Sequence, residues 1–125
     1  TEVILPRMTS DICQVFCDIV DGKQPTITWN DQATLGIVLA SKGYPGSYEK
    51  GYAIKGTDKV DGSIYHMGTA LKDGEYVTSG GRVMIVVCQA PTLREAQQKA
   101  AAEVAKIECE NLFHRSDIGD KAFKY

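Results

Sequence analysis

The residues of this chain that could do chemistry gather in two glycine-rich segments. The first covers residues 41–51 (SKGYPGSYEKG) and the second covers residues 78–82 (TSGGR). Glycine allows backbone conformations that a Cβ would forbid, and it lets the backbone approach a ligand closely. Arg82, which ends the second segment, could bind an anion through two parallel hydrogen bonds. From spacing alone, each segment is either a wall of a binding site or a structural turn, and both interpretations stay open.

The other reactive residue types show no arrangement typical of a catalytic or metal site. No Gly-Lys-Ser/Thr sequence closes the first segment as in a phosphate-binding loop, and there is no GxGxxG motif. His66 has no carboxylate or nucleophile placed to use it, so a structural role is favoured. The cysteines form no CxxC pair, and no histidine lies at zinc-ligand spacing from a cysteine pair. We expect a cytoplasmic protein with no metal site, in which the cysteines are reduced and apolar in character: Cys13, Cys17, Cys88 and Cys109.

The composition excludes several classes of function. The chain has 125 residues, of which 43% are hydrophobic and 24% are charged, as is typical of one globular domain. A net charge of −2 does not give the positive field that a nucleic-acid partner needs. The longest apolar run, residues 83–88, is too short to span a bilayer, so we expect no membrane partner. The first residue is Thr1, and we therefore expect a processed or excised piece of a longer protein.

Two helices are expected, one near each end of the chain. Residues 5–22 predict the first helix, with Thr9 or Ser10 as its cap and Gly22 as its end. Thr92 and Glu95 form a capping box, and the apolar stripe after them predicts a long helix that ends near residue 110. On its outer side, ion pairs are expected between Glu95 and Lys99 and between Lys106 and Glu110. The apolar face of the first helix needs a partner surface and consists of Ile12, Val15, Phe16, Ile19 and Val20.

The middle of the chain is typical of strands joined by short turns. We expect strands at residues 34–40, 52–55, 63–71, 76–78 and 83–88. The dipeptides Asp61-Gly62 and Asp73-Gly74 predict hairpin turns, which favour antiparallel pairing. Residues 83–88 do not alternate with polar residues, which indicates a central strand buried on both faces. The tail from residue 112 is expected to return to the edge of the sheet, so the pattern as a whole predicts an α+β fold.

Four segments in fixed order resemble one enzyme family. They are residues 40–51, 65–69, 78–83 and 115–119. Together they strongly resemble the C-terminal part of the glycinamide ribonucleotide synthetase family, also called phosphoribosylamine–glycine ligase. Residues 1–7 and the helix after them look like the stretch that follows the metal-binding segment of the family's ATP-grasp domain. The resemblance covers essentially the whole chain, and four ordered motifs are far more specific than any one of them.

The resemblance implies a fold and a division into domains. The implied fold is α+β, with an antiparallel sheet or flattened barrel and a long helix, similar to the rudiment single hybrid motif of biotin carboxylase-like enzymes. Residues 1–25 would be the C-terminal helix of the ATP-grasp domain, and residues 26–125 would be the ligase C-terminal domain.

The resemblance also implies an activity for the whole enzyme. The family joins glycine to 5-phosphoribosylamine and converts ATP to ADP and phosphate in purine (IMP) biosynthesis. Its cofactors would be ATP and magnesium, with manganese possible, and its metal ligands would lie upstream of Thr1. We therefore expect this chain to bind no cofactor and to be inactive alone. Its expected partners are the ATP-grasp and N-terminal domains of the same enzyme and the substrates glycine and phosphoribosylamine.

Carried over by motif, the substrate-cleft residues lie in both glycine-rich segments. Arg82 would be the best candidate for an anionic group of the substrate, and Lys50 would be a weaker one. No catalytic or metal-binding residue is expected in this chain. The other residues of the two walls would be Gly43, Tyr44, Pro45, Gly46, Gly80 and Gly81.

The alternative to the ligase hypothesis is a non-catalytic carrier-like or interaction module that uses a related sheet. A carrier would need a modifiable lysine at a hairpin tip, within a motif that Lys59 and Lys72 lack. The ligase hypothesis predicts that the segments of Tyr44 and Arg82 converge on one concave side, beside the first helix. The carrier hypothesis does not predict that these segments converge.

Overall fold

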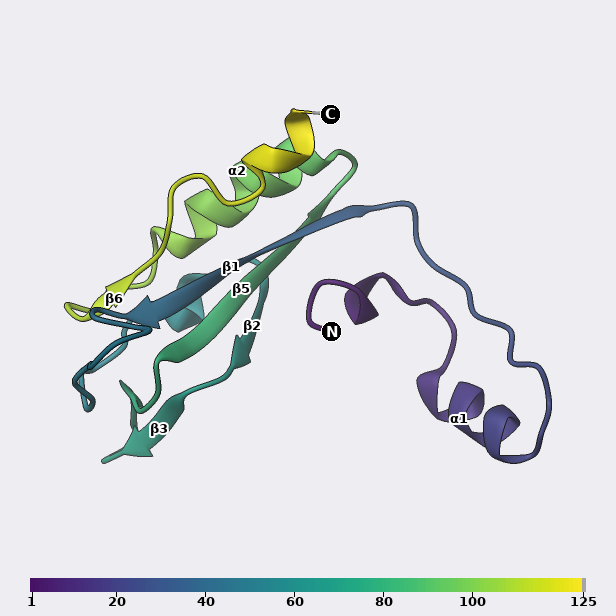
Figure 1. Ribbon diagram of the computed structural model, residues 1–125, viewed down its shortest axis with the longest axis horizontal. Helices are drawn as coiled ribbons and strands as arrows, with labels where there is room; N and C mark the ends of the chain where they lie inside the picture. The colour runs from purple at the N-terminus through teal and green to yellow at the C-terminus, as the bar shows by residue number, and fades with distance from the viewer. Residues whose placement is uncertain (125) are drawn as a thin grey trace.

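A four-stranded antiparallel sheet lies at the centre of the computed structural model, which describes residues 1–124 (Figure 1). The strand order is β2-β5-β1-β6. Strand β5 is buried from Val83 to Cys88, which confirms the prediction of a central strand. The tail returns to the sheet edge, as expected, because β6 pairs with the end of β1. The strands are β1 (Ala33–Ser41), β2 (Ser63–His66), β5 (Arg82–Ala90) and β6 (Leu112–Phe113).

A second, two-stranded sheet is the hairpin of β3 (Thr69–Lys72) and β4 (Glu75–Thr78). Its turn confirms one predicted hairpin, because Asp73 and Gly74 both have positive φ, 51° and 84°. The other Asp-Gly pair forms no hairpin. Asp61 lies in a bend before β2, where its N–H group donates to the carboxylate of Glu103 at 2.6 Å.

Two of the predicted strands are shorter or interrupted. Residues 52–55 make only isolated bridges, between Ala53 and Val77 and between Lys55 and Glu108. Residues 63–71 divide into β2 and β3 because the N–H groups at positions 67 and 68 both donate to the carbonyl of Val83. This shared acceptor turns the chain away from β5 and directs β3 toward the second sheet.

The pairing of β1 with β5 changes register at the end that carries the glycine-rich segments. It runs from Ala33 opposite Ala90 to Leu39 opposite Met84, and then shifts so that Ala40 lies opposite Arg82. Such a bulge bends a strand and changes where its side chains point. It therefore shapes the sheet where the first segment leaves β1 and the second enters β5.

Helix α2 (Leu93–Val104) covers one face of the sheet and begins with the predicted capping box of Thr92 and Glu95. It is shorter than predicted, because residues after Ala105 turn to form the bridge with Lys55. The expected ion pairs are also wrong: Glu95 bonds to Thr92, Lys99 pairs with Asp61 at 3.3 Å, and Lys106 pairs with Glu103 at 2.7 Å. The shared core contains Leu35, Ile37, Leu39, Val83, Met84, Val86, Cys88, Ala96, Ala100 and Val104.

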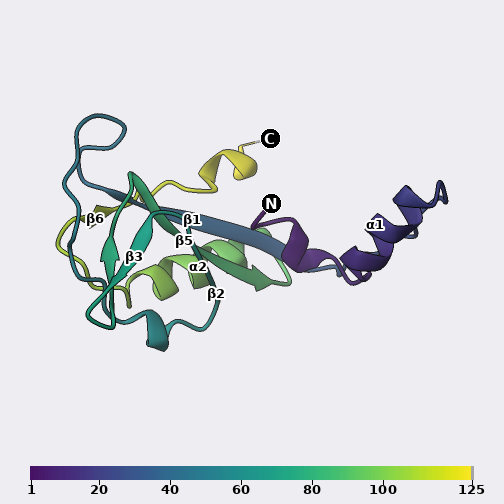
Figure 2. The same ribbon diagram turned by 90° about the horizontal axis from the view of Figure 1, so that it is seen from below.

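Helix α1 (Ile12–Val20) projects away from the sheet (Figures 1 and 2). Its cap is Asp11, and not Thr9 or Ser10, since the Asp11 carboxylate accepts the N–H groups of residues 13 and 14. Gly22, with φ of 71°, follows its last turn. Val15 is buried, but the rest of the predicted apolar face is largely exposed, with exposed fractions of 59% at Phe16, 55% at Ile19 and 85% at Val20. No helix of residues 1–124 is long and apolar enough to cross a membrane.

The N-terminal segment is attached to the far end of β5 by polar contacts. Gln89 donates to the carbonyl of Pro6 at 3.0 Å and accepts from the amide of Asn30 at 3.2 Å. Arg7 donates to the carbonyl of Asn30 at 3.0 Å. These bonds fix the arm that carries α1 at the end of the sheet opposite the glycine-rich segments.

Candidate functional site

The two glycine-rich segments meet at one end of the four-stranded sheet. The N–H and Oγ groups of Ser41 donate to the carbonyls of Gly81 and Gly80, both at 2.8 Å. Farther along the first segment, the N–H of Gly51 donates to the carbonyl of Thr78 at 2.7 Å. Both ends of the first segment are thus bonded to the second, so the segments of Tyr44 and Arg82 converge as predicted, while a concave side that both residues line stays a prediction.

The Tyr44 ring lies directly against the backbone of Gly81. A Cβ at Gly81 would come within 2.2 Å of Tyr44 Cδ2, so a side chain there would displace the ring. Tyr44 is joined to Pro45 by a cis peptide bond, and Gly43 has φ of 96°. A Cβ at Gly43 would also lie 2.1 Å from the carbonyl oxygen of Ser47. The glycines at 43 and 81 are therefore required by the shape of this wall.

A third glycine completes the packing and was missed by the reasoning from sequence. Gly68 accepts the N–H groups of Ser79 and Gly80 at 2.8 and 3.0 Å. A Cβ at Gly68 would lie 2.5 Å from the carbonyl oxygen of Arg82. Its position inside the family-like motif 65–69 was the available signal, but the motif does not reveal which strand it contacts.

The two cationic candidates are exposed side chains at this end of the molecule. Arg82 and Lys50 are both exposed, and neither side chain makes an ion pair or hydrogen bond within residues 1–124. The Nζ atom of Lys50 lies 6.0 Å from the centroid of the Tyr48 ring. An Arg that is not committed to an internal partner can form two bonds to a carboxylate or a phosphate.

Two open hollows border the first segment and share Glu49. One has a volume of about 320 Å³, and the other, about 490 Å³, lies between Glu49 and Tyr52. The hydroxyl of Tyr52 donates to the Glu49 carboxylate at 2.5 Å, and this bond with the nearby negative charge raises the pKa of Tyr52. Reasoning from sequence missed Tyr52 and the hollows, because both depend on how the segment folds back. The smaller hollow is lined by Lys42, Ser47, Tyr48, Glu49 and Asn111.

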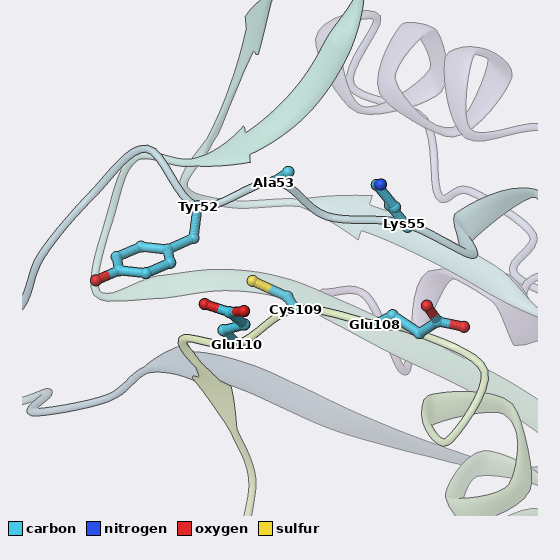
Figure 3. Close-up of a pocket in the computed structure, with 6 residues that line it drawn as sticks. All are labelled: Tyr52, Ala53, Lys55, Glu108, Cys109 and Glu110. Carbon is cyan, nitrogen blue, oxygen red and sulfur yellow. The ribbon is translucent and has the colours of Figure 1, made fainter.

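A further pocket of about 370 Å³ separates residues 52–55 from residues 108–110 (Figure 3). Its sides are held by reciprocal backbone bonds between Lys55 and Glu108, at 2.9 and 3.0 Å. Figure 3 shows the Tyr52 ring and the Glu110 carboxylate facing the same space at one end. Within residues 1–124, no group of three or more His, Cys, Asp or Glu side chains could hold a metal ion. The residues described do not fit a magnesium site, and no metal-dependent step is assigned to them.

The expected position beside the first helix is wrong. Helix α1 lies beyond the opposite end of β1 from the glycine-rich segments (Figure 2). The nine residues of β1 separate the two places, a span of roughly 30 Å at 3.3 Å per residue. The length of β1 therefore keeps α1 away from the candidate site.

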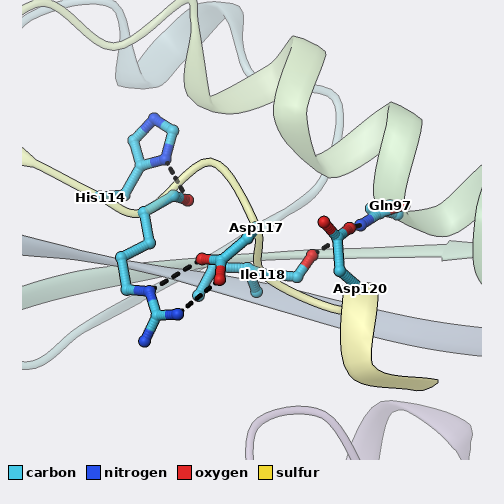
Figure 4. A network of polar contacts seen from close by, with 6 residues as sticks. Gln97, His114, Asp117, Ile118 and Asp120 are labelled. Carbon is cyan, nitrogen blue, oxygen red and sulfur yellow. Dashed lines mark hydrogen bonds and ion pairs between the residues drawn. The ribbon is translucent and has the colours of Figure 1, made fainter. Parts of the chain in front are cut away.

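The remaining residues singled out by their motifs have structural partners. His66 bonds to Thr69 Oγ1 at 2.9 Å and stacks near Tyr76, with 4.6 Å between ring centroids. In the tail, Arg115 pairs with Asp117, which lowers the pKa of that carboxyl, and Gln97 of α2 donates to Ile118 and Asp120 (Figure 4). The motif at 115–119 thus attaches the tail to α2.

The comparisons with known proteins identify the family. The family model "Phosphoribosylglycinamide synthetase, C domain" matches residues 34–121. The chain belongs to this family. Among curated relatives of this C domain, the phosphoribosylamine–glycine ligase of Halalkalibacterium halodurans is 50% identical over 98% of the chain and 29% of the relative. That of Streptococcus pneumoniae is 43% identical over 99% of the chain and 30% of the relative.

A solved structure of a C-domain relative confirms the fold. The crystal structure of phosphoribosylamine–glycine ligase from Thermotoga maritima matches with a TM-score of 0.76 and 31% identity, over 86% of this chain and 27% of that one. The predicted α+β class, with an antiparallel sheet and one long helix, is therefore confirmed. The chain spans about 30% of the length of the curated relatives that it matches.

Proposed function

We propose that this chain is the C-terminal part of a phosphoribosylamine–glycine ligase. Such an enzyme joins glycine to 5-phosphoribosylamine and converts ATP to ADP and phosphate in purine biosynthesis. The proposal is supported by relatives of that name, which match nearly the whole chain at 43–50% identity. We assign no second function, because no feature of residues 1–124 favours a carrier over the ligase.

The contribution of this chain would be two walls of the substrate cleft. The observation that carries this assignment is the junction of the glycine-rich segments, which brings the Tyr44 wall against the Gly81 wall with Arg82 exposed at its edge. Arg82 would orient an anionic group of glycine or of phosphoribosylamine, and Lys50 would add positive charge nearby. ATP, bound with magnesium or manganese by the rest of the enzyme, would supply the phosphoryl group that activates the glycine carboxylate.

The division into domains is part of the same proposal. Residues 1–25 would complete the ATP-grasp domain, and residues 26–125 would form the C-terminal domain. Three features support the boundary: α1 projects away from the sheet, its apolar face is largely exposed apart from Val15, and an extended connection leads from α1 to β1. The remainder of the enzyme would be the partner of α1, and the location would be the cytoplasm.

A chimeric ligase tests the proposed function. Residues 1–125 would replace the matched part of the Halalkalibacterium halodurans enzyme, and ADP formation would be measured with ATP, glycine and phosphoribosylamine. We expect the chimera to be active and the same enzyme truncated before this part to be inactive, as would be the 125-residue chain alone. A folded chimera without activity, or activity of the chain alone, would contradict the proposal.

The role of Arg82 is tested in the same chimera. Arg82→Ala should raise the KM of the substrate whose anionic group it binds by roughly tenfold or more, as loss of a charged hydrogen bond costs about 1.5–3 kcal/mol. Arg94→Ala is the matched control, because Arg94 follows the opposite end of β5 and stacks on Phe123. Equal KM values for the Arg82 and Arg94 variants would show that Arg82 does not bind the substrate.

A further inference from the structure

Buried polar side chains are concentrated behind the two glycine-rich segments. A buried polar group without a hydrogen bond costs free energy, so such groups persist where they hold a specific geometry. Glu103 lies elsewhere, on α2, while the other three lie at the junction of the segments. Within residues 1–124 the buried polar and charged residues are Ser41, Thr78, Glu103 and Asn111.

Ser41 and Thr78 connect one segment to the other. Ser41 is fully buried and donates through its N–H and Oγ groups to two consecutive carbonyls, those of residues 81 and 80. Thr78 is 1% exposed, and its N–H donates to the carbonyl of Tyr52 while its Oγ1 accepts the N–H of Tyr52 at 3.2 Å. These bonds fix the distance between the walls, but they do not fix the shape of the first segment between its ends.

Asn111, which lies just before β6 and outside both segments, supplies that constraint. Its carbonyl accepts the N–H of Lys42 at 2.9 Å, and its Nδ2 donates to the carbonyl of Glu49 at 3.2 Å. One residue thus holds the first segment at two points, on either side of Tyr44, Pro45 and Gly46. Asn111 is only 9% exposed and lines the smaller hollow, so it holds the segment from within the molecule.

We propose that Asn111 is a positioning residue for substrate binding, and this role rests on the proposed function of the two walls. A loop already held in its binding conformation avoids the entropic cost of being ordered when the substrate arrives. The hydrogen bond from the Asn111 amide fixes the position of Glu49, where the first segment turns back toward the sheet. It thereby also fixes the position of the Tyr44 ring on Gly81. Loss of the hydrogen bond from the Asn111 side-chain amide to Glu49 therefore weakens substrate binding and leaves the chemical step unchanged.

Asn111→Asp in the chimeric ligase tests this role. The substitution keeps the size of the side chain and the backbone bond to Lys42, but it replaces the donor that faces the Glu49 carbonyl with a carboxylate oxygen. We expect KM for at least one of glycine and phosphoribosylamine to rise about three- to tenfold, the equivalent of one lost hydrogen bond, with kcat within about twofold. KM values equal to those of the unsubstituted chimera would overturn the proposal.

The pH profile provides a readout that a purely structural role would not move. In the Asn111→Asp variant the introduced carboxyl, once protonated, can donate to the Glu49 carbonyl, and burial raises the pKa of a carboxyl group. The ratio of variant to parent KM should therefore fall toward one as the pH is lowered. Lys42, Tyr48 and Glu49 line the same hollow, Tyr52 bonds to Glu49, and all four residues are present in both enzymes. A ratio that does not change with pH would contradict the proposal.

A second variant and a matched control complete the experiment. If Asn111→Asp does not fold, Asn111→Ser removes the amide without adding charge, and the same rise in KM is expected. Glu103→Gln alters the fourth buried polar residue, away from the segments, and should lower the melting temperature without changing KM. An unsubstituted chimera without activity would contradict the proposed function, whereas an active chimera with no KM effect in either Asn111 variant would contradict only the positioning role.

Discussion

The contact between Tyr44 and Gly81 shows how one residue pair sets the shape of the candidate site. The two residues are far apart in sequence, and the ring fills the space that a side chain at position 81 would occupy. Gly81 is not among the residues with positive φ, so its need for glycine comes from this ring and not from backbone strain. The requirement therefore depends on Tyr44 and should disappear when the ring is removed.

A double-mutant cycle tests this dependence. Gly81→Ala alone should destabilise the chain by about 1–3 kcal/mol, because the added methyl overpacks the contact. In a Tyr44→Ala background the same change should cost less than about 0.5 kcal/mol. Urea unfolding of the four variants measures both values. Equal costs in the two backgrounds would show that the ring does not lie on Gly81.

The glycine-rich segments could be predicted from the sequence, but the buried polar residues that bond to them could not. Glycine clusters are visible as turns in any sequence, and the family-like motifs contain them. Ser41 and Asn111 are residue types that usually lie on surfaces or in turns, and their burial arises only when β1, β6 and the second segment come together. The sequence predicts that the tail returns to the sheet edge, but it does not predict which side chains that pairing buries.

At the scale of elements, the start of α2 was easier to predict than its end. The capping box of α2 is a local pattern of residues 92 and 95, and the structure contains it. The end of α2 is set by a distant partner, because the chain beyond Ala105 turns to pair with Lys55. The same distant contacts explain why Lys106 pairs with Glu103 and not with Glu110.

Glu103 fixes this end of α2 to the bend before β2. Its carboxylate accepts hydrogen bonds from the ammonium group of Lys106 and from the N–H of Asp61. Both bonds lower the pKa of Glu103, and the bond from Lys106 has the larger effect. A carboxyl with a lowered folded-state pKa contributes its full stability above its ordinary pKa. That contribution is lost as the pH falls through the lowered value.

Glu103→Gln should therefore reduce stability at neutral pH and change its pH dependence. The melting temperature of the variant should lie below that of the parent at pH 7. The gap should narrow as the pH falls below about 5, because the parent loses the charged interaction that the variant never had. Circular dichroism melts from pH 3 to 7 measure this, with Glu75→Gln on the exposed hairpin as a control. A difference in melting temperature that does not change with pH would show that the charge of Glu103 is not its cause.

At the scale of the whole molecule, the N-terminal arm differs from the rest of the chain. The sheet and α2 bury their apolar residues against each other, whereas α1 exposes Phe16, Ile19 and Val20. The apolar spacing of α1 predicted a face that needs a partner, and the structure shows that the sheet of this chain does not supply one. Under the proposed division into domains, the remainder of the ligase covers that face.

The exposed thiol of Cys13 makes this proposal testable. Cys13 precedes Phe16 and Val20 by three and seven residues, so the three side chains lie on the same side of α1. With Cys17→Ser in place to leave one thiol on the helix, Cys13 should react rapidly with a thiol reagent in the 125-residue chain. In the chimeric ligase it should react at least about tenfold more slowly, because the ATP-grasp domain would cover this face.

Cys88 is the internal reference for that experiment. It is 2% exposed, and burial raises the pKa of its thiol, so it should stay unreactive in both proteins until they are unfolded. Labelling is followed by mass spectrometry of the peptides that contain each cysteine. If Cys13 reacts at the same rate in the chain and in the active chimera, α1 is not covered by the ligase. Residues 1–25 would then be an arm of the C-terminal domain and not the last helix of the domain before it.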